Sequence, residues 1–494
     1  MARPLHEGLV EAARRAPDHP GVLAGESAWS FADLDHLSDA FARRLGAAGV
    51  GAGNRVLVMT TNRVEFVVAV HALSRVGAAA VLLNPGWKTA EVAHAIALTD
   101  PVLGIVDGPA VDVLRPLVPV LDLDALDPLT GADEGTDDRV DATVDVDAES
   151  VLVFSSGTTG MPKAVRHTHR SMGEATAHWV ASLGLTGADR IQIATPPTHI
   201  LGLLNLLAAA EVGATVRLHP RFDLDELLRC IERERMTLEM AVAPIALAMA
   251  NHPTIEDYDL SSLRYIVWGA TPVTESVART VTRRTGVHWL PGYGASEVPV
   301  ISCNPVDQPE RWRLDSAGLP PAGVELRVAD LETGATLPAG ETGEIQVRSA
   351  SAMVGYLPEE ATADAFADGW YRTGDVGWLE PEGWVHLTDR AKEMIKVNGF
   401  QVAPAEVEAI LLGHASVLDC AVFGVPDDRA GEVPVAAVQL DPDAPASAAE
   451  LQDLVASSLA TYKHVRHVVV VDAIPRLPSG KALRRVLRDE WFAT

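Results

Sequence analysis

Short apolar runs alternate with helical stretches through the first three quarters of the 494-residue chain. The run RVLVMT (55–60) precedes a helical stretch at 63–77, and AAAVLLNP (78–85) precedes another at 89–100. The same rhythm returns later in SVLVFSS, RIQIATP, ATVRLHP, TLEMAVA and LRYIVWGA. Apolar runs separated by helices are typical of buried strands in mainly parallel sheets. The sequence therefore predicts an α/β fold.

The pattern of apolar and turn-forming residues changes after Gly318. Two turn-rich segments, 331–349 and 367–390, indicate antiparallel β structure with tight turns. From Asp389 onward, β-like and helical runs are mixed over about a hundred residues, a length that suits a separate small α+β domain.

Composition excludes several classes of partner. The net charge of −27 repels nucleic acid and anionic lipid, so we expect neither as the main partner. The three cysteines lie far apart with no CxxC pair, which favours reduced thiols in a cytoplasmic protein. The beginning of the chain lacks the apolar core of a secretory signal, and the longest apolar stretch, 200–214, is too short to span a membrane.

One loop has the composition of a phosphate-binding turn. The apolar strand ending at Phe154 leads into SSGTTGMPK, and a helix is expected to begin near 167–171. Glycines allow close backbone approach, successive N–H groups form an anion-binding nest, and hydroxyls and a lysine add donors. The candidate residues are Ser155, Ser156, Gly157, Thr158, Thr159, Gly160 and Lys163. The alternative is a solvated turn between strand and helix.

The loop does not fit the commonest phosphate-binding pattern. Pro162 stands where the Walker motif has its second glycine, and Ala164 stands where that motif has its Mg²⁺-binding hydroxyl. The sequence therefore gives no support to a Walker-type NTPase.

Five motifs in order carry a family resemblance. SSGTTGMPK resembles the signature of the adenylate-forming superfamily, which includes acyl-CoA synthetases, peptide-synthetase adenylation domains and firefly luciferase. The further motifs are GYGASE (292–297, with Ser296 replacing the usual Thr), YRTGD (371–375), DRAKEMIKVNGFQVAPAEVE (389–408) and PRLPSGKALRR (475–485). The resemblance covers nearly the whole chain, and the fourth motif is most similar to that of coumarate-CoA-ligase-like enzymes.

The resemblance implies a domain organisation and a reaction. Residues 1–388 should form an AMP- and acyl-binding domain with two mainly parallel βα sheets and a small β-barrel-like subdomain. Residues 389–392 should form a hinge, and 393–494 a small mobile α+β domain. The reaction implied joins a carboxylic acid to ATP as acyl-AMP with release of pyrophosphate, and then transfers the acyl group to coenzyme A. ATP, Mg²⁺ and coenzyme A are the cofactors expected.

The resemblance also assigns nucleotide-site roles. Lys481 should bridge the acid carboxylate and the α-phosphate, although an ordinary basic helix face with Arg484, Arg485 and Arg488 is the alternative. Glu297 and Thr159 should hold Mg²⁺, Asp375 with Arg390 should contact the ribose, and Tyr293 should stack on adenine. A turn aspartate is the alternative for Asp375. The remaining nucleotide-binding candidates are Gly269, Ala270, Thr271, Gly292, Gly294, Ala295 and Ser296.

The resemblance further implies that the C-terminal domain alternates between two orientations about Lys392. In the second orientation Lys396 and Gln401 should approach the nucleotide phosphate, and Gly399 should let the pantetheine chain pass close to the backbone. A basic turn before the helix at Pro404 remains the alternative for all three.

The acyl pocket is predicted to be uncharged. His199 should gate it, although a histidine packed in the core is the alternative. Its linings should be His199, Leu201, Asn205, Val267, Ala270, Gly292, Gly294, Val300 and Ile301. Ile200 stands where amino-acid-activating relatives carry an Asp. A second charge on the substrate would be buried unpaired, so we expect an apolar aromatic, terpenoid or medium-chain monocarboxylic acid. Thr198 and Trp268 depart from the family pattern.

Three other functions stay open at this point. The acyl group could instead be loaded onto a separate carrier protein. The chain could be a non-catalytic nucleotide sensor, although Lys481, Glu297, Asp375 and Arg390 are all present. Luciferase-type oxygenation is the third. A homodimer is also kept as a hypothesis.

Overall fold

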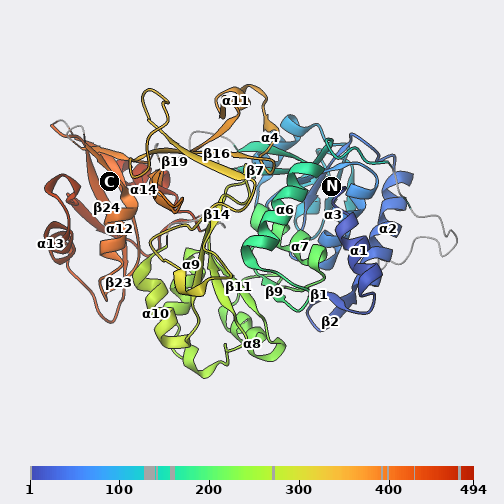
Figure 1. Ribbon diagram of the computed structural model, residues 1–494, viewed down its shortest axis with the longest axis horizontal. Coiled ribbons are helices and arrows are strands. Elements are labelled where there is room, and N and C mark those ends of the chain that lie inside the picture. The colour runs from blue at the N-terminus through green and yellow to red at the C-terminus, as the bar shows by residue number, and fades with distance from the viewer. Residues whose placement is uncertain are drawn as a thin grey trace.

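The computed structural model describes residues 3–126, 140, 143–155, 162–269, 273–390, 393–397, 400–427, 429–476 and 480–493. Within these ranges the strands form four sheets, of eight, seven, five and five strands. The N-terminal helices lie at one side of the molecule and the C-terminal sheet at the other, with the segment around residues 220–300 between them (Figure 1).

The first sheet has strand order β14-β13-β12-β11-β9-β10-β1-β2 and is parallel from β13 to β1. Its strands are β1 Pro20–Ala24, β2 Ser27–Ser30, β9 Arg190–Ile193, β10 Thr215–Leu218, β11 Leu238–Ala241, β12 Tyr265–Trp268, β13 Trp289–Tyr293 and β14 Ser302–Cys303. The helices that follow these strands are α7 Ile200–Val212, α8 Leu224–Glu234, α9 Ala243–Asn251 and α10 Glu275–Thr285. The βα alternation predicted from the apolar runs is confirmed.

The second sheet has strand order β17-β8-β7-β4-β3-β5-β6 and is parallel from β7 to β6. Its strands are β3 Arg55–Met59, β4 Ala79–Leu82, β5 Leu103–Val106, β6 Val120–Asp122, β7 Glu149–Ser155, β8 Lys163–Thr168 and β17 Gly355–Leu357. The helices of this half are α1 Glu7–Arg15, α2 Phe31–Ala47, α3 Val64–Arg75, α4 Thr89–Thr99, α5 Ala110–Leu114 and α6 His169–Leu183.

Strand β8 was missed by the sequence prediction. We expected the phosphate loop to lead directly into a helix, and α6 does begin at His169, within the predicted span. Between loop and helix, however, β8 runs antiparallel to β7 and also pairs with β17. The strand is only six residues long, so no periodicity marked it.

The segments after Gly318 form the predicted antiparallel structure. The third sheet consists of β15 Val324–Ala329, β16 Gly343–Ser349, β18 Phe366–Ala367, β19 Trp370–Leu379 and β20 Val385–Arg390. The helix α11 Glu360–Ala363 lies beside it in sequence.

The C-terminal residues have a hydrophobic core of their own, formed largely by β23 and β24. This sheet contains β21 Ile395–Val397, β22 Phe400–Val402, β23 Val417–Asp427, β24 Gly431–Leu440 and β25 His467–Val470. Its helices are α12 Pro404–Leu411, α13 Ala448–Ser458 and α14 Arg484–Ala493. The mixture of strands and helices agrees with the α+β character expected from the sequence.

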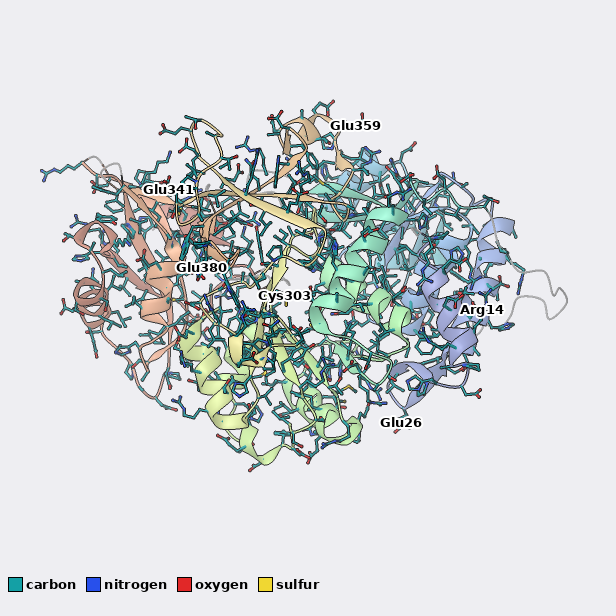
Figure 2. The ribbon with its side chains drawn as sticks, in the orientation of Figure 1. Arg14, Glu26, Cys303, Glu341, Glu359 and Glu380 are labelled. Atoms are coloured by element: carbon teal, nitrogen blue, oxygen red, sulfur yellow. The ribbon has the colours of Figure 1, made fainter. Side chains whose placement is uncertain are left out.

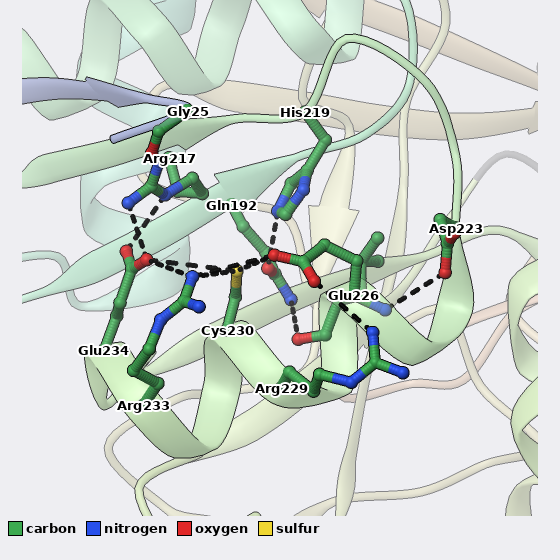
Figure 3. A network of polar contacts seen from close by, with 11 residues as sticks. Gly25, Gln192, Arg217, His219, Asp223, Glu226, Arg229, Cys230, Arg233 and Glu234 are labelled. Carbon is green, nitrogen blue, oxygen red and sulfur yellow. Dashed lines mark hydrogen bonds and ion pairs between the residues drawn. The ribbon is translucent and has the colours of Figure 1, made fainter. Parts of the chain in front are cut away.

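Helix α8 shows how polar side chains attach a helix to the first sheet (Figure 3). The Asp223 carboxylate caps the helix by accepting from the Glu226 N–H at 3.1 Å. Near its other end, Glu234 pairs with Arg217 of β10, whose Nη1 donates to the Gly25 carbonyl at 2.7 Å. Burial raises the pKa of the Cys230 thiol to about 11, so this cysteine is a protonated packing residue.

In the part of the chain that the structure describes, no helix combines the length and the apolar character that crossing a bilayer requires. The prediction of no membrane span agrees with this.

Candidate active site

The site lies along one edge of the first sheet. Strands β11, β12 and β13 are parallel neighbours, so their carboxyl ends lie side by side. The residues that leave this edge are 242–244 after β11, Gly269 after β12 and Gly294 after β13. In open parallel sheets, ligands bind in the crevice outside the carboxyl ends of the strands. Ala270 and Thr271, predicted to extend the wall after Gly269, lie outside the described residues.

A tight turn follows β13 and presents Ser296 and Glu297. A Cβ on Gly294 would lie 2.1 Å from the Pro299 carbonyl oxygen, so only glycine fits there. The turn is closed by the Ala295 N–H, which donates to the Val298 carbonyl at 3.0 Å. The end of β13 with Gly292, and the turn with Ala295, thus border the predicted nucleotide site.

His167 ties the same turn to β8. Its Nε2 lies 2.8 Å from the Ser296 carbonyl oxygen. Burial lowers the pKa of His167 to about 4, so the ring is neutral near pH 7. A carbonyl oxygen only accepts, so Nε2 carries the proton and donates it to Ser296.

Asp375, Arg390 and Tyr293, which were predicted to contact ribose and adenine, form one cluster. Asp375 of β19 lies directly opposite Arg390 of β20, and the Arg390 Nε is 2.9 Å from Asp375 Oδ1. The Tyr293 hydroxyl donates to Asp375 Oδ2 at 2.5 Å. Asp375 raises the pKa of Arg390, and burial with Asp375 raises that of Tyr293. Arg390 therefore stays charged and Tyr293 stays protonated near pH 7.

Glu297 is a buried carboxylate with a neutral donor. The Tyr356 hydroxyl donates to Glu297 Oε1 at 2.7 Å, and the Lys163 Nζ lies 5.1 Å from the centre of the Tyr356 ring. Among the described residues, no cation pairs with Glu297 within salt-bridge distance. Mg²⁺ in nucleotide sites is bound by one or two carboxylates together with phosphate oxygens and waters. The chemistry of Glu297 therefore fits a magnesium ligand, while Thr159 lies outside the described residues.

The predicted phosphate loop connects β7 and β8. Ser155, at the end of β7, lies opposite Lys163 at the beginning of β8, so the loop closes a hairpin. Ser156, Gly157, Thr158, Thr159 and Gly160 lie outside the described residues. Lys163 brings its ammonium to the Tyr356 ring, next to Glu297.

Lys481 is presented on a loop that reaches the same sheet edge. The helix α14 begins only at Arg484, so Lys481 does not belong to a basic helix face. Gly480 has a φ of +84°, and a Cβ there would lie 2.8 Å from Pro244 Cδ and 3.4 Å from Val242 Cβ. The loop is thus in close contact with the residues that follow β11. The Lys481 Nζ lies 2.9 Å from Glu393 Oε1.

The other predicted catalytic residues of the C-terminal part lie on a hairpin. Lys396 of β21 is directly opposite Gln401 of β22, and the Lys396 N–H donates to Glu432 Oε2 at 2.7 Å. Lys396 is exposed. Lys392 and Gly399 lie outside the described residues, as does the side chain of Gln401.

His199 begins helix α7 and has a defined tautomer. Its Nδ1 accepts from the Leu201 N–H at 3.4 Å, and burial lowers its pKa. The neutral ring therefore carries its proton on Nε2. His199 acts here as the cap of a helix, which neither supports nor opposes the predicted gating role.

Most of the predicted acyl linings lie in the apolar core between the two main sheets. Val267, Val300 and Ile301 are buried there, and Leu201 packs against it. Asn205 is also buried, and its Oδ1 accepts from the Trp179 Nε1–H at 2.8 Å. The Asn205 amide oxygen is therefore satisfied within the protein.

Trp268 faces away from this core. Neighbouring strand residues point to opposite faces, and Val267 belongs to the core on the α7 side of the sheet. Trp268 belongs to the core formed with α9 and α10, where its ring lies 5.0 Å from that of Trp289. The large residue at position 268 thus fills the opposite side of the sheet.

Cys303 packs behind Gly292. Cys303 of β14 pairs with Gly292 of β13 near the centre of the molecule (Figure 2). A Cβ on Gly292 would lie 3.5 Å from Cys303 Sγ. Burial raises the pKa of this thiol to about 12, so Cys303 is a packing residue rather than a nucleophile.

Sequence reasoning missed several side chains that contact the site. Tyr356 lies outside every motif, and its contact with Glu297 follows from the pairing of β17 with β8. Glu393 lies inside the fourth motif, but nothing in the pattern indicated that it pairs with Lys481. Its position directly after the predicted hinge was the only available signal.

Comparison with protein families gives two matches. A family model described as AMP-binding enzyme matches residues 9–357, and one described as AMP-binding enzyme C-terminal domain matches residues 406–481. Together these models cover most of the chain.

Individual proteins agree with the family models. The chain is 35% identical to 4-coumarate–CoA ligase 2 of Oryza sativa subsp. japonica, over 99% of this chain and 93% of that protein. The o-succinylbenzoate CoA synthetase of Bacillus subtilis with its acyl-adenylate intermediate has a TM-score of 0.87 at 31% identity, covering 99% and 98% of the chains. The anthranilate CoA ligase AuaEII with anthranoyl-AMP has a TM-score of 0.92 at 26% identity, covering 99% and 97%.

Proposed function

The chain belongs to the AMP-binding enzyme family of adenylate-forming ligases, and from this premise we propose that it is an acid–CoA ligase for an apolar monocarboxylic acid. It converts the acid to acyl-AMP with ATP and then transfers the acyl group to coenzyme A. The expectation of a cytoplasmic enzyme rests on its three free cysteines.

One observation carries the proposal. The Lys481 loop and the Asp375 cluster come from different parts of the chain, yet both contact the carboxyl edge of the first sheet. Gly480 packs on Pro244 after β11, and Asp375 accepts from Tyr293 at the end of β13. The strand β12 lies between β11 and β13. A nucleotide held at Tyr293 would therefore be separated from the Lys481 loop by the width of this one strand.

The first step forms a bond between a carboxylate oxygen and the α-phosphorus of ATP and breaks the bond to the β-phosphate. Negative charge builds on the phosphate oxygens, and fixed cations stabilise such charge most effectively. Lys481 would bridge the carboxylate and the α-phosphate, and Asp375 with Arg390 would hold the ribose. Glu297, with Thr159, would hold Mg²⁺, which neutralises charge on the departing pyrophosphate.

In the second step the sulfur of coenzyme A attacks the acyl carbon, the thiol proton is released, and AMP leaves. We propose that residues 393–494 rotate about the segment 389–392 between the two steps. The contact of Gly480 with Pro244 supports assigning the present arrangement to the first step. The exposure of Lys396 is consistent with a hairpin, bearing Gln401 and Gly399, that enters the site only after rotation about Lys392.

The acid should be apolar because the described residues predicted to line its pocket offer no ionic partner. The described linings are aliphatic except for Asn205, whose amide oxygen already accepts from Trp179, and the neutral His199. Burying an unpaired second charge costs several kcal/mol, roughly a hundredfold or more in rate. Cinnamate-like, terpenoid and medium-chain acids meet this condition.

An acid panel in ATP–pyrophosphate exchange tests this specificity. Cinnamate, benzoate, octanoate, a terpenoid acid, malonate and phenylalanine would be compared at equal concentration. We expect at least one apolar monocarboxylate to exceed malonate and phenylalanine about a hundredfold. Faster exchange with malonate, which has a second carboxylate, or with phenylalanine, which has an ammonium, would refute the proposed acid class.

The acceptor is tested separately. Purified enzyme with ATP, a good acid and coenzyme A should yield the acyl-CoA thioester by mass spectrometry. Acyl-AMP that accumulates with coenzyme A and is consumed only by a carrier protein would favour the carrier-loading alternative. Absence of exchange with every acid would favour a nucleotide sensor.

A further inference from the structure

Glu393 lies between the predicted hinge and the catalytic loop. Its carboxylate is largely buried, with 15% of the side chain exposed, and it contacts two cations. Oε1 is 2.9 Å from the Lys481 Nζ, and Oε2 pairs with Arg484. Although burial opposes ionisation, Arg484 and Lys481 lower the pKa of Glu393, so it is charged near pH 7.

Arg484 has a second carboxylate of its own. Its Nη2 is 2.8 Å from Glu408 Oε1 of α12, and its Nε donates to the Val422 carbonyl at 2.9 Å. The beginning of α14 is therefore anchored even without Glu393. Within the described residues, Lys481 has one carboxylate in salt-bridge distance, that of Glu393.

The backbone beside Lys481 is fixed independently. Arg476 Nη1 donates to the Gly480 carbonyl at 2.7 Å, and Arg476 is itself held by Asp419. Gly480 in turn contacts Pro244. The contacts of the loop backbone thus fix the position of the Lys481 main chain, and the ion pair with Glu393 fixes the position of its ammonium.

We propose that Glu393 is a positioning residue for the adenylation step, holding the Lys481 ammonium at the sheet edge while leaving it free to contact both reactants. This inference rests on the proposed function of the site. It assigns a role to a carboxylate that contacts neither substrate.

The Lys481 ammonium has enough N–H donors to contact Glu393 and both reactants at once. An ammonium has three N–H donors and no acceptor. Glu393 uses one of them, so two remain for the substrate carboxylate and the α-phosphate. A lysine side chain is long and flexible, so an ammonium already held in place loses less freedom when the reactants bind.

The position of Glu393 also links the ammonium to the rotation. Glu393 follows Arg390 by three residues, and the Glu393 N–H donates to the Arg390 carbonyl at 2.9 Å. Arg390 pairs with Asp375 at the ribose site. The partner of Lys481 is thus attached to the segment about which the C-terminal part would turn.

The test compares Glu393→Gln with Glu408→Gln in two half-reactions. Adenylation is followed by ATP–pyrophosphate exchange, and thioester formation by the conversion of supplied acyl-AMP with coenzyme A. Both variants weaken the pairing of Arg484, but only Glu393→Gln removes the charge beside Lys481. We expect Glu393→Gln to lower the adenylation rate about tenfold with the KM for ATP little changed. Glu408→Gln should stay within about twofold in adenylation, and both variants should keep thioester formation.

A double-mutant cycle shows whether Glu393 acts through Lys481. Adding Glu393→Gln to Lys481→Ala should cause no further loss of adenylation, because the group being positioned is already absent. Glu393→Asp, which keeps the charge but withdraws the carboxylate by one methylene, should be intermediate and can replace Glu393→Gln if that variant does not fold.

Three results would overturn the inference. These are wild-type adenylation in Glu393→Gln, an equal loss in Glu408→Gln, or losses that multiply in the cycle. The proposed function fails in a different measurement, since it requires the unmodified chain to adenylate an acid. An unmodified chain that adenylates normally while Glu393→Gln is unaffected refutes only the role of Glu393.

Discussion

Asp375 and Glu393 each hold a cation beside the site, but different structural elements position them. Asp375 lies on β19 directly opposite Arg390 on β20, so strand register sets their distance. Glu393 lies between β20 and β21, and its partner Lys481 precedes α14 on a loop. The first pair is built into a sheet, and the second depends on side-chain contacts between separate segments.

This difference matches the two tasks that the reaction sets. A nucleotide that stays bound through both steps needs fixed contacts, which strands provide. In the proposed function, a lysine needed in only one step must be able to leave with residues 393–494, and the contact of its loop with Pro244 can break without unfolding a sheet. We therefore expect damage to Asp375 to affect both steps, and damage around Lys481 to affect the first alone.

A large effect on both half-reactions should come from Asp375→Asn. The change removes the charge that pairs with Arg390 and weakens an acceptor for the ribose hydroxyls and Tyr293. Two charge-assisted hydrogen bonds are worth about 3 kcal/mol, so the KM for ATP should rise about a hundredfold. Steady-state kinetics would show this rise, and thioester formation from acyl-AMP should also weaken. A defect in only one of the two half-reactions would contradict the expectation that Asp375 serves both steps.

Acid should destabilise the N-terminal part of the chain through His71. His71 of α3 is fully buried, and its pKa is lowered to about 3, first by burial and then by Arg75. The unfolded chain binds the proton near pH 6.5, so stability is present above that pH and is lost as pH falls toward 3. At pH 5 the loss is about 2 kcal/mol from this residue, whereas Glu393 has a lowered pKa and stays paired.

Replacement of His71 measures this contribution. His71→Leu should reduce the fall in the free energy of unfolding between pH 7 and pH 5 by about 2 kcal/mol, as seen in urea denaturation at each pH. The matched control is His36→Leu at an exposed position. This change should leave the pH dependence of the free energy of unfolding unaltered. Equal slopes for His71→Leu and the unmodified protein would show that His71 is not buried neutral.

Gly480→Ala should act on the Lys481 region. The new Cβ would lie 2.8 Å from Pro244 Cδ and would strain a backbone with φ +84°. Adenylation should fall about tenfold, while thioester formation from acyl-AMP is retained. Gly334 has a φ of +71° with open space around it, so Gly334→Ala adds similar strain without the clash. If Gly334→Ala lowered adenylation equally, loop docking would not explain the effect.

Asp419→Asn should give the smallest effect. Asp419 holds Arg476, which donates to the Gly480 carbonyl, so its influence on Lys481 passes through two contacts. The amide oxygen of Asn can still accept from Arg476, and adenylation should fall about threefold. A loss larger than that of Gly480→Ala, measured in the same exchange assay at equal melting temperature, would reverse the order proposed.

Much of the fold was predictable because buried parallel strands are marked by local pattern. The apolar runs that became β3 and β4 are continuous, and stretches with the 3.6-residue period of a helix separate the strands. The strand β8 was missed because it is short and because one of its two partners, β17, lies far away in the sequence. Antiparallel pairing of that kind has no signature in six residues.

The site was predictable where residues lie in motifs, and less so where contacts join distant segments. Tyr293, Asp375 and Arg390 were named from three separate motifs, and the structure brings them together. Tyr356 and Glu393 were not named, because their partners Glu297 and Lys481 lie 59 residues and more away. The effect of Trp268 also needed the structure, since only strand pairing shows which face of the sheet it fills.

The most direct test of this account is to measure both half-reactions in Lys481→Ala and in Lys396→Ala. We predict that Lys481→Ala lowers ATP–pyrophosphate exchange about a hundredfold or more while it converts supplied acyl-AMP to acyl-CoA at nearly the normal rate. Lys396→Ala should show the reverse pattern. Equal losses in both half-reactions for either variant would contradict a catalytic lysine that serves one step and then leaves the site.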